Sequence, residues 1–502
     1  MAKVFVGLVV LLVASAGCSS SPGGGAGSAG TTGAGGGAGT GGAGQGGGAG
    51  TGGGAGTGGS VIGGAGGRGG TGGTGGDSFS GAATLTVGGS PTTGTLADNG
   101  TARVTYKFSG TQGELIQIAT TTGTTAFDPT YPDLVITLFG PDQKQLAQAQ
   151  DPWPHTAYAP TLFTVLPSTG TYFIEIENCY QVFATDCRVN AAMVNRGYTI
   201  RVADVVAPIR IDESAEPGND TAAGAAPIAY TKAGGSSYVP VLVHGTFTSK
   251  TDHDTYTFTV PADAPVAPGT RARANFWIQH DDTNGNGSTA VASKVYVVDP
   301  ADTSGAHIAE FDAWDFNNYR DGLQANLTFP VQLGKSYTFV VNAQTSLDVG
   351  SNPFYLFQHL SGAGADAPLV EAEPNDTLAT ADTLAAISQP DGSYAFTVDG
   401  DLSPAGSDVD FHKLALPSGV TLTSMKGQCM GRRIGSGLSL LKYELVDSGG
   451  TVLVAQTEFG NDDAMLSTLT IPAGGFTLRV SATAQAATIT GGSYMCRVVA
   501  KP

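Results

Sequence analysis

The chain has 502 residues, 75 of them glycine, and carries a net charge of −18 with a pI near 4.6. An acidic surface of this kind excludes nucleic acid as an expected partner and favours cations. The length that follows the first 77 residues predicts two to four domains.

Residues 1–17 have the features of a secretory signal peptide. Lys3 supplies the positive charge, residues 4–13 form the apolar segment, and small residues precede a cleavage point. Cys18 follows, and Ser-Ala-Gly-Cys at 15–18 resembles the lipobox of bacterial lipoproteins, although Ser15 stands where Leu is usual. The resemblance implies a membrane anchor through lipidation of Cys18 and an outer-membrane lipoprotein on the cell surface or the periplasmic face. The alternative is a secreted protein that loses Cys18 with its signal.

Residues 18–77 form a low-complexity segment of Gly, Ala, Thr and Ser that has no aromatic residue. Such a composition cannot bury a core, so we expect a disordered linker. As a flexible Gly-rich coil it would span on the order of 40 Å, which would hold the folded part clear of a membrane. A Gly-rich fibre is the alternative, but the segment lacks the strict triplet of collagen.

Three strand patterns follow the linker, and each occurs three times. The first is a strand that ends in an acidic or Gly turn. The second is a Pro-Gly turn followed by a strand that an aromatic residue opens. The third is a short strand that precedes both of the others within each copy. The first pattern occurs at 133–142, 294–302 and 441–449. The second occurs at 166–176, 329–341 and 471–480, and the third at 105–108, 256–260 and 412–416.

These repeats predict three modules of one topology, at 78–206, 207–365 and 366–502, each of ordinary domain size. Alternate side chains of the second pattern are apolar, which places one face of each strand on a core. Antiparallel strands of this number and spacing predict a two-sheet β-sandwich or jelly roll. The predicted fold class is therefore all-β, with three tandem β-sandwich or jelly-roll modules after a disordered Gly-rich linker.

Four cysteines remain after Cys18, and each pair falls within one predicted module. In an oxidising compartment we expect two disulfides, Cys179 with Cys187 and Cys429 with Cys496. Loop entropy predicts a stabilisation of about 2 kcal/mol for the first and about 4 kcal/mol for the second. A metal site built on cysteine is the weaker alternative, because the sequence has neither a C-x-x-C motif nor a nearby His pair.

An acidic segment opens the third module, Glu-Ala-Glu-Pro-Asn-Asp-Thr at 371–377, and a damaged copy lies at 213–221. An Asp-x-Asp pair follows each copy after about thirty residues, at 252–254 and at 408–410. Carboxylate and amide oxygens that converge in this way suit Ca²⁺ better than redox or nucleophilic chemistry.

With these motifs, the modules resemble the bacterial pre-peptidase C-terminal domain family, which includes the collagen-binding domains of clostridial collagenases. The resemblance implies a β-sandwich that accompanies secreted enzymes or cell-surface proteins, often with Ca²⁺; the peptidase is missing here. The third module matches best, the second has Ser214 and Gly218 as departures, and the first lacks the acidic segment. The Ca²⁺-binding residues that the resemblance implies are Glu371, Glu373, Asn375, Asp376, Asp408 and Asp410.

Other interpretations of the same residues stay open. Asp376 and Thr377 can instead cap a turn or a short helix over 378–384. Asp408, Asp410 and His412 share one face of a regular strand, which would allow a mixed carboxylate and His site. His412, however, aligns with Tyr256 of the second module, which favours a His packed at the edge of the core.

Three loops are further candidates. Residues 282–287 match the first half of a Ca²⁺ loop, but Ser293 stands where the bidentate Glu belongs, so a hairpin tip is the better interpretation. The aromatic loops at 152–158 and 314–319 can stack on sugars or hold a protein partner, or simply cover the end of a sandwich.

Known catalytic motifs are missing from the sequence: it has no H-E-x-x-H and no G-x-S-x-G. We therefore expect no enzyme but a lipid-anchored cell-surface binding or adhesion protein, whose partner is an extracellular protein or polysaccharide. The alternatives are a secreted hydrolase, or its accessory subunit, with a site in the second module, and a passive envelope component.

Overall fold

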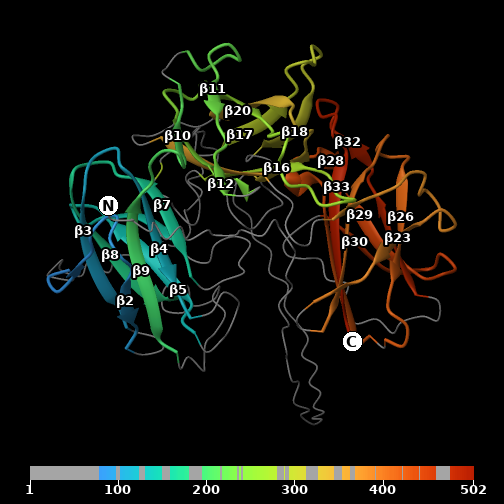
Figure 1. Ribbon diagram of the computed structural model, residues 1–502, viewed down its shortest axis with the longest axis horizontal. Coiled ribbons are helices and arrows are strands. Elements are labelled where there is room, and N and C mark those ends of the chain that lie inside the picture. Colours follow the sequence, from blue (N-terminus) through green and yellow to red (C-terminus); the bar gives the residue numbers. More distant parts are fainter. Residues whose placement is uncertain are drawn as a thin grey trace, which may run out of the picture. The chain divides into compact units, whose positions relative to one another are not determined.

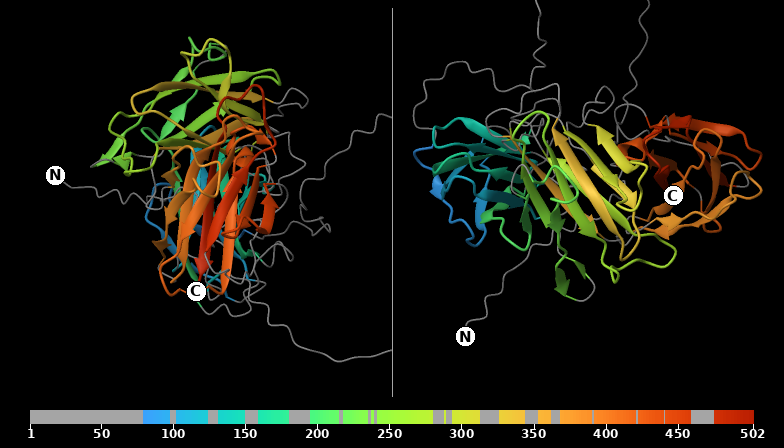
Figure 2. Two further views of the ribbon diagram at one scale, coloured as in Figure 1. Left: turned by 90° about the vertical axis from the view of Figure 1, so that its right-hand side faces the viewer. Right: turned by 90° about the horizontal axis from the view of Figure 1, so that it is seen from above.

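The computed structural model describes residues 79–97, 102–123, 131–149, 159–179, 195–214, 218–234, 237–238, 241–279, 288, 293–312, 326–343, 353–361, 368–389, 392–420, 422–439, 441–458 and 475–502. Almost all the regular structure in these ranges is β-strand, next to one short 3₁₀ helix, η1 (Arg432–Ile434) (Figure 1). The two further views of Figure 2 show the same strands with hardly any coiled ribbon among them. No helix in the described ranges is long and apolar enough to cross a membrane.

Two sheets come from residues 83–204. Their strands, in spatial order, are β1 (Ala83–Thr84), β3 (Val104–Gly110), β8 (Gly170–Asn178), β5 (Leu134–Phe139) and β6 (Gln145–Ala149) in the first, and β2 (Thr92–Thr95), β9 (Gly197–Asp204), β4 (Leu115–Thr121) and β7 (Thr161–Val165) in the second.

Two more sheets come from residues 210–361, together with a small hairpin. One sheet has the order β10 (Arg210–Asp212), β14 (Val241–Thr246), β21 (Phe354–Ser361), β16 (Arg273–Gln279) and β19 (Asn326–Pro330). The other has the order β11 (Ala226–Ile228), β15 (His253–Thr259), β20 (Ser336–Ala343), β17 (Ser293–Val298) and β18 (His307–Asp312), and the hairpin pairs β12 (Lys232–Gly234) with β13 (Ser237–Tyr238).

The last two large sheets come from residues 369–501. One has the order β22 (Leu369–Val370), β25 (Tyr394–Asp401), β33 (Ser493–Lys501) and β27 (Ser424–Met430), with β24 (Ile387–Ser388) beside β25. The other has the order β23 (Asp382–Ala385), β26 (Val409–Ala415), β31 (Phe476–Ser481), β29 (Lys442–Val446) and β30 (Val452–Thr457), and β28 (Leu438–Ser439) pairs with β32 (Ala484–Gln485).

Each of the three parts of the chain has its own hydrophobic cluster, to which both of its large sheets contribute. This is the arrangement of a β-sandwich, in which the inner faces of two sheets enclose the core. The alternate apolar side chains of the second strand pattern are at most 3% exposed, as predicted: Tyr172, Ile174, Ile176, Tyr337, Phe339, Val341, Phe476, Leu478 and Val480.

One strand pair has the same register in all three parts of the chain. The third strand pattern lies antiparallel to the second, and the middle residue of each apolar triplet faces an inward residue of its partner. The facing pairs are Tyr106 with Ile174 in β3–β8, Tyr256 with Phe339 in β15–β20, and His412 with Leu478 in β26–β31. Since a slip of one residue would turn every side chain to the other face, this agreement reflects one repeated arrangement.

The prediction of an all-β chain with several sheets is confirmed. Cys429 and Cys496 form a disulfide between facing positions of β27 and β33, as predicted. Cys179 is also disulfide-bonded, but its predicted partner Cys187 lies outside the described residues. The signal peptide, Cys18 and residues 18–77 lie outside them too, and the jelly-roll topology and the module boundaries stay predictions.

Candidate metal centre

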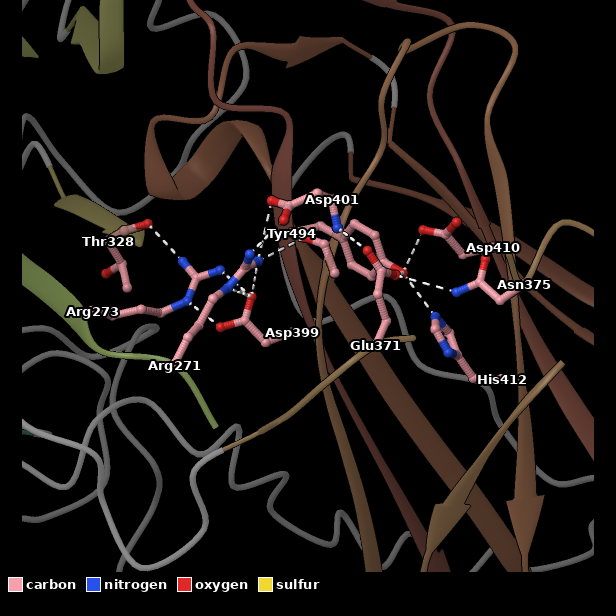
Figure 3. Close-up of polar contacts among 11 residues, drawn as sticks. Arg271, Arg273, Thr328, Glu371, Asn375, Asp399, Asp401, Asp410, His412 and Tyr494 are labelled. Carbon is pink, nitrogen blue, oxygen red and sulfur yellow. Dashed lines mark hydrogen bonds and ion pairs between the residues drawn. The ribbon is translucent and has the colours of Figure 1, made fainter. Parts of the chain in front are cut away.

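The acidic segment of the third part lies between β22 and β23, beside the start of β26. Val370 of β22 leads directly into Glu371, and Asp410 lies in β26. Two groups of potential ligands form where these elements meet, and in each group the ligand atoms lie within 4.8 Å of one another. The groups are Glu371 with Asp410 and His412, and Glu373 with Asp408 and Asp410; Figure 3 shows the first.

The remaining two predicted ligands lie beside these groups. The Nδ2 of Asn375 lies 3.4 Å from Oε2 of Glu371. Burial and, to a smaller extent, the neighbouring carboxyl group of Asp376 raise the pKa of Asp408. The structure therefore brings together all six predicted residues, which come from positions about forty apart in the chain. Whether they bind a cation stays a prediction.

Tyr494 of β33 occupies the centre of the first group. Its Oη lies 2.7 Å from Oδ2 of Asp410, 3.0 Å from Oε2 of Glu371 and 2.7 Å from Nε2 of His412. A phenol has one proton to donate, so it can satisfy only one of the two carboxylates as an anion. Glu371 also accepts from the backbone N–H of Asp401, whereas Oδ1 of Asp410 has no donor among the described residues, so without a cation Asp410 is the acid that favours keeping a proton.

The pKa values of the two acids agree with that conclusion. Burial, opposed by several hydrogen bonds, raises the pKa of Glu371 above its usual range. Burial and, next, the charge of Glu371 raise the pKa of Asp410. Burial lowers the pKa of His412 to about 4, so that this imidazole is neutral near pH 7. The neutral ring donates to or accepts from Tyr494 and lies fully inside the core, as expected for a packed His.

Two oxygen atoms in the cluster have no hydrogen-bond donor among the described residues. They are Oδ1 of Asn375 and Oδ1 of Asp410, and both residues are completely buried. A buried acceptor without a partner lowers stability by about 1–3 kcal/mol. A cation with oxygen ligands would satisfy both atoms, so the residues present fit Ca²⁺ or a similar hard ion.

The alternative interpretation of the acidic segment is right in part. Thr377 and Thr380 form a turn in which the backbone N–H of Thr380 donates to the carbonyl oxygen of Thr377 over 3.0 Å. No helix follows, because residues 382–385 are strand β23. The segment therefore has both a turn and an acidic cluster.

The corresponding position of the second part of the chain has more protein donors than the third, but Oδ1 of Asn219 and Oδ1 of Asp220 there are also buried without a partner among the described residues. The hydroxyls of Tyr256 and Tyr355 lie 2.5 Å apart, and Tyr355 also donates to Asp254. The carboxylate of Glu213 accepts from the backbone N–H of Thr246 over 3.0 Å and from its hydroxyl. In the first part the pair is Tyr106 and Tyr198, whose hydroxyls lie 3.0 Å apart. What distinguishes the third part among the described residues is that three or more potential ligand side chains converge there.

An arginine pair lies next to the cluster. Arg271 and Arg273 both bind the carboxylate of Asp399, which is 1% exposed, and Arg271 also binds Asp401. The backbone N–H of Asp401 in turn donates to Oε1 of Glu371. In Figure 3, Asp399 and Asp401, both of β25, lie between the arginine pair and Glu371.

Sequence reasoning missed Tyr494 as a member of the site and missed the arginine pair. One signal was present, because Tyr198 and Tyr494 both open closing strands with the pattern Tyr-x-x-Arg-Val. The loop at 282–287 and the aromatic loops at 152–158 and 314–319 lie outside the described residues.

Comparisons with known proteins assign no family. No family model matches the chain, and no curated protein matches it. The chain is similar to the pre-peptidase C-terminal domain of a Bacillus anthracis collagenase, with 13% identity, coverage of 24% of this chain and 93% of that one, and a TM-score of 0.17. It is also similar to the tandem CBM22 domains of Paenibacillus barcinonensis Xyn10C, with 13% identity, coverage of 51% of this chain and 82% of that one, and a TM-score of 0.15. A third similar structure is that of the CUB1-EGF-CUB2 domains of human MASP-1/3, with 10% identity, coverage of 54% of this chain and 99% of that one, and a TM-score of 0.15.

Proposed function

We propose that the chain is a lipid-anchored cell-surface protein that binds an extracellular protein or polysaccharide and performs no catalysis. In this proposal Cys18 carries the lipid, residues 18–77 are the tether, and residues 78–206, 207–365 and 366–502 are three sandwich modules of the pre-peptidase C-terminal type. The location is the outer membrane, on the cell surface or the periplasmic face.

The observation that carries the proposal is the repeated strand register. Tyr106, Tyr256 and His412 occupy one position in three successive sandwich cores, and each contacts a tyrosine hydroxyl from another strand. These polar pairs are buried among core side chains, where a ligand does not reach them. Repetition of this arrangement increases the outer surface of the protein, and a large outer surface suits binding or adhesion.

The proposal includes a structural Ca²⁺ in the third module. Glu371, Glu373, Asn375, Asp376, Asp408 and Asp410 would hold the ion, since they offer only oxygen atoms and two of those atoms are buried without a donor. The ion would replace the proton that Glu371 and Asp410 otherwise share through Tyr494. Its effect would be to tie the acidic segment to β26, which stabilises the module without taking part in a reaction.

Binding and catalysis are tested together. The chain from Ser19 to Pro502 is applied to arrays of extracellular-matrix proteins and polysaccharides, and the same probes are checked for cleavage. We expect saturable binding without turnover. Turnover that one substitution within residues 207–365 abolishes would replace the proposal with a hydrolase, and the absence of any saturable binding would favour a passive envelope component.

The anchor is tested separately. Cells that express the full chain are labelled with an alkyne-tagged fatty acid and compared with cells that express Cys18→Ala. Label in the wild type and none in the variant is the expected result. Equal label in both, or an unlabelled protein in the medium, would contradict lipidation of Cys18.

A further inference from the structure

A cavity of about 420 Å³ lies at the edge of the β11–β15 sheet. Its floor comes from edge strand β11 and from β15, and the hairpin β12–β13 forms one side. The residues that matter here are Pro227, Tyr230, Lys232, Tyr238, Phe258 and Pro261. This volume lies within the range of about 300–1,000 Å³ that is usual for small-ligand sites.

Two tyrosines form adjacent walls of this cavity. The ring centroids of Tyr230 and Tyr238 are 6.0 Å apart, and the ring planes meet at 81°. Both side chains are half-buried, so the edge of one ring supports the other while part of each stays accessible. A rigid aromatic wall of this type offers a large contact area and loses little conformational entropy on binding.

One carboxylate next to the cavity, that of Asp263, binds two of the residues that line it. Asp263 binds the ammonium group of Lys232 through Oδ2 and the hydroxyl of Tyr238 through Oδ1. The side chains of Lys232 and Asp263 are nevertheless 49% and 59% exposed. Each carboxylate oxygen can accept a further hydrogen bond and the ammonium group can donate two more.

We propose that this cavity binds one ring of an uncharged polysaccharide, and this proposal rests on the binding function proposed above. The apolar C–H face of a sugar ring would lie on Tyr230 or Tyr238, and two neighbouring hydroxyls would bind Asp263 and Lys232. The opposite charges of Lys232 and Asp263 cancel, so this pair favours a neutral ligand. The net charge of −18 disfavours an anionic polymer as well.

A proline-rich peptide is the other ligand that aromatic grooves accept. It would use the tyrosines but leave the oriented carboxylate and ammonium group without ligand partners. The sugar uses both the walls and these two groups, which is why we favour it.

The test measures binding by calorimetry with the chain from Ser19 to Pro502. The probes are hexasaccharides of β-1,4-glucose, β-1,4-xylose and α-1,4-glucose, a heparin-derived hexasaccharide, and decaproline. We expect saturable binding of at least one neutral hexasaccharide and none of the heparin fragment or decaproline. Tyr238→Ala is expected to weaken that binding by about tenfold or more, since ring and hydroxyl are both lost.

Three further variants separate the roles. Tyr238→Phe keeps the wall and frees one carboxylate oxygen, so it should weaken binding less than Tyr238→Ala does. Asp263→Asn should weaken it, whereas Asp142→Asn, which alters an exposed Lys–Asp pair elsewhere, should not. Unchanged thermal unfolding shows that each variant is folded.

Three outcomes would overturn the proposal: a hexasaccharide that binds Tyr238→Ala as tightly as the wild type, preference for decaproline, or no binding of any neutral hexasaccharide. If the wild type still binds a protein or polysaccharide on the arrays, unchanged binding to Tyr238→Ala, or no binding of any neutral hexasaccharide, rejects this cavity as the sugar site but leaves the proposed binding function standing. If it binds nothing on the arrays either, the proposed binding function fails with it.

Discussion

Gly400 lies directly opposite Tyr494 in the β25–β33 strand pair, and a Cβ atom at Gly400 would lie 2.3 Å from the tyrosine hydroxyl. The same facing pair recurs as Gly245 with Tyr355 and as Gly94 with Tyr198. In each case the tyrosine ring covers the glycine and directs its hydroxyl at the inward side chain of the neighbouring sheet. Glycine in a strand often marks such a close approach.

Gly400→Ala is therefore expected to destabilise the protein. A methyl group at that position collides with the fully buried ring of Tyr494 and lies 2.4 Å from Oε2 of Glu371. Overpacking of this kind lowers the free energy of unfolding by about 1–3 kcal/mol. Denaturant unfolding measures the change. Gly197→Ala is the matched control, because nothing lies within 4 Å of its Cβ position; a loss at Gly400 no larger than at Gly197 would contradict the close contact.

Ca²⁺ is expected to bind and to stabilise the chain. Calorimetric titration with CaCl₂ should show heat at millimolar ion or below, and Asp410→Asn should weaken binding at least tenfold, since Asp410 belongs to both ligand groups. Asp447→Asn removes an acid of a β-turn in the same part of the chain and should leave the titration unchanged. No heat with the wild type would remove the site.

The stabilisation by Ca²⁺ should increase with pH. Burial raises the folded-state pKa values of Glu371 and Asp410, so without metal these acids favour the folded state at low pH. That contribution is lost as pH rises through the raised values, at up to about 1.4 kcal/mol per pH unit for each proton. Ca²⁺ displaces the protons, so the calcium-induced rise in Tm should be larger at about pH 8.5 than at about pH 5.5. An equal rise at both would contradict the shared proton.

Removal of the Cys429–Cys496 disulfide should lower the free energy of unfolding whether or not a metal ion or a ligand is present. The bridge closes a loop with a sequence separation of 67, for which loop entropy predicts about 4 kcal/mol. The double variant Cys429→Ala and Cys496→Ala is compared with the wild type by thermal unfolding. Reduction of the wild type also breaks the disulfide of Cys179, so it should lower Tm at least as much as the double variant does. An unchanged Tm of the double variant would count against the assignment.

Loss of Asp399 should cost more than loss of either arginine that binds it. Asp399→Ala leaves the largely buried Arg271 and Arg273 without their shared partner, an arrangement for which about 3–5 kcal/mol is typical. Arg271→Ala should cost less, because Arg273 still neutralises the carboxylate. Lys144→Ala, from an exposed pair, should change the free energy of unfolding by less than about 1 kcal/mol. Equal effects of Asp399→Ala and Lys144→Ala in urea unfolding would contradict the buried pairing.

The sequence by itself determined the strands, their apolar faces and the acidic cluster. The triplet at Tyr172, Ile174 and Ile176 is a local period-two pattern, which is legible because side chains of a strand alternate between two faces. The six clustered residues could be predicted because they occupy two short motifs, and the pair Cys429 and Cys496 because few cysteines compete as partners; that the six bind Ca²⁺ stays a prediction.

Only the tertiary structure decided what completes the site. Tyr494 lies 84 residues from Asp410, and Arg271 lies 128 residues from Asp399. Such contacts depend on which strands become neighbours in a sheet and on the register between them, and neither leaves a local pattern in the chain. For the same reason the sequence allowed a helix after Thr377, whereas pairing with β26 makes residues 382–385 a strand.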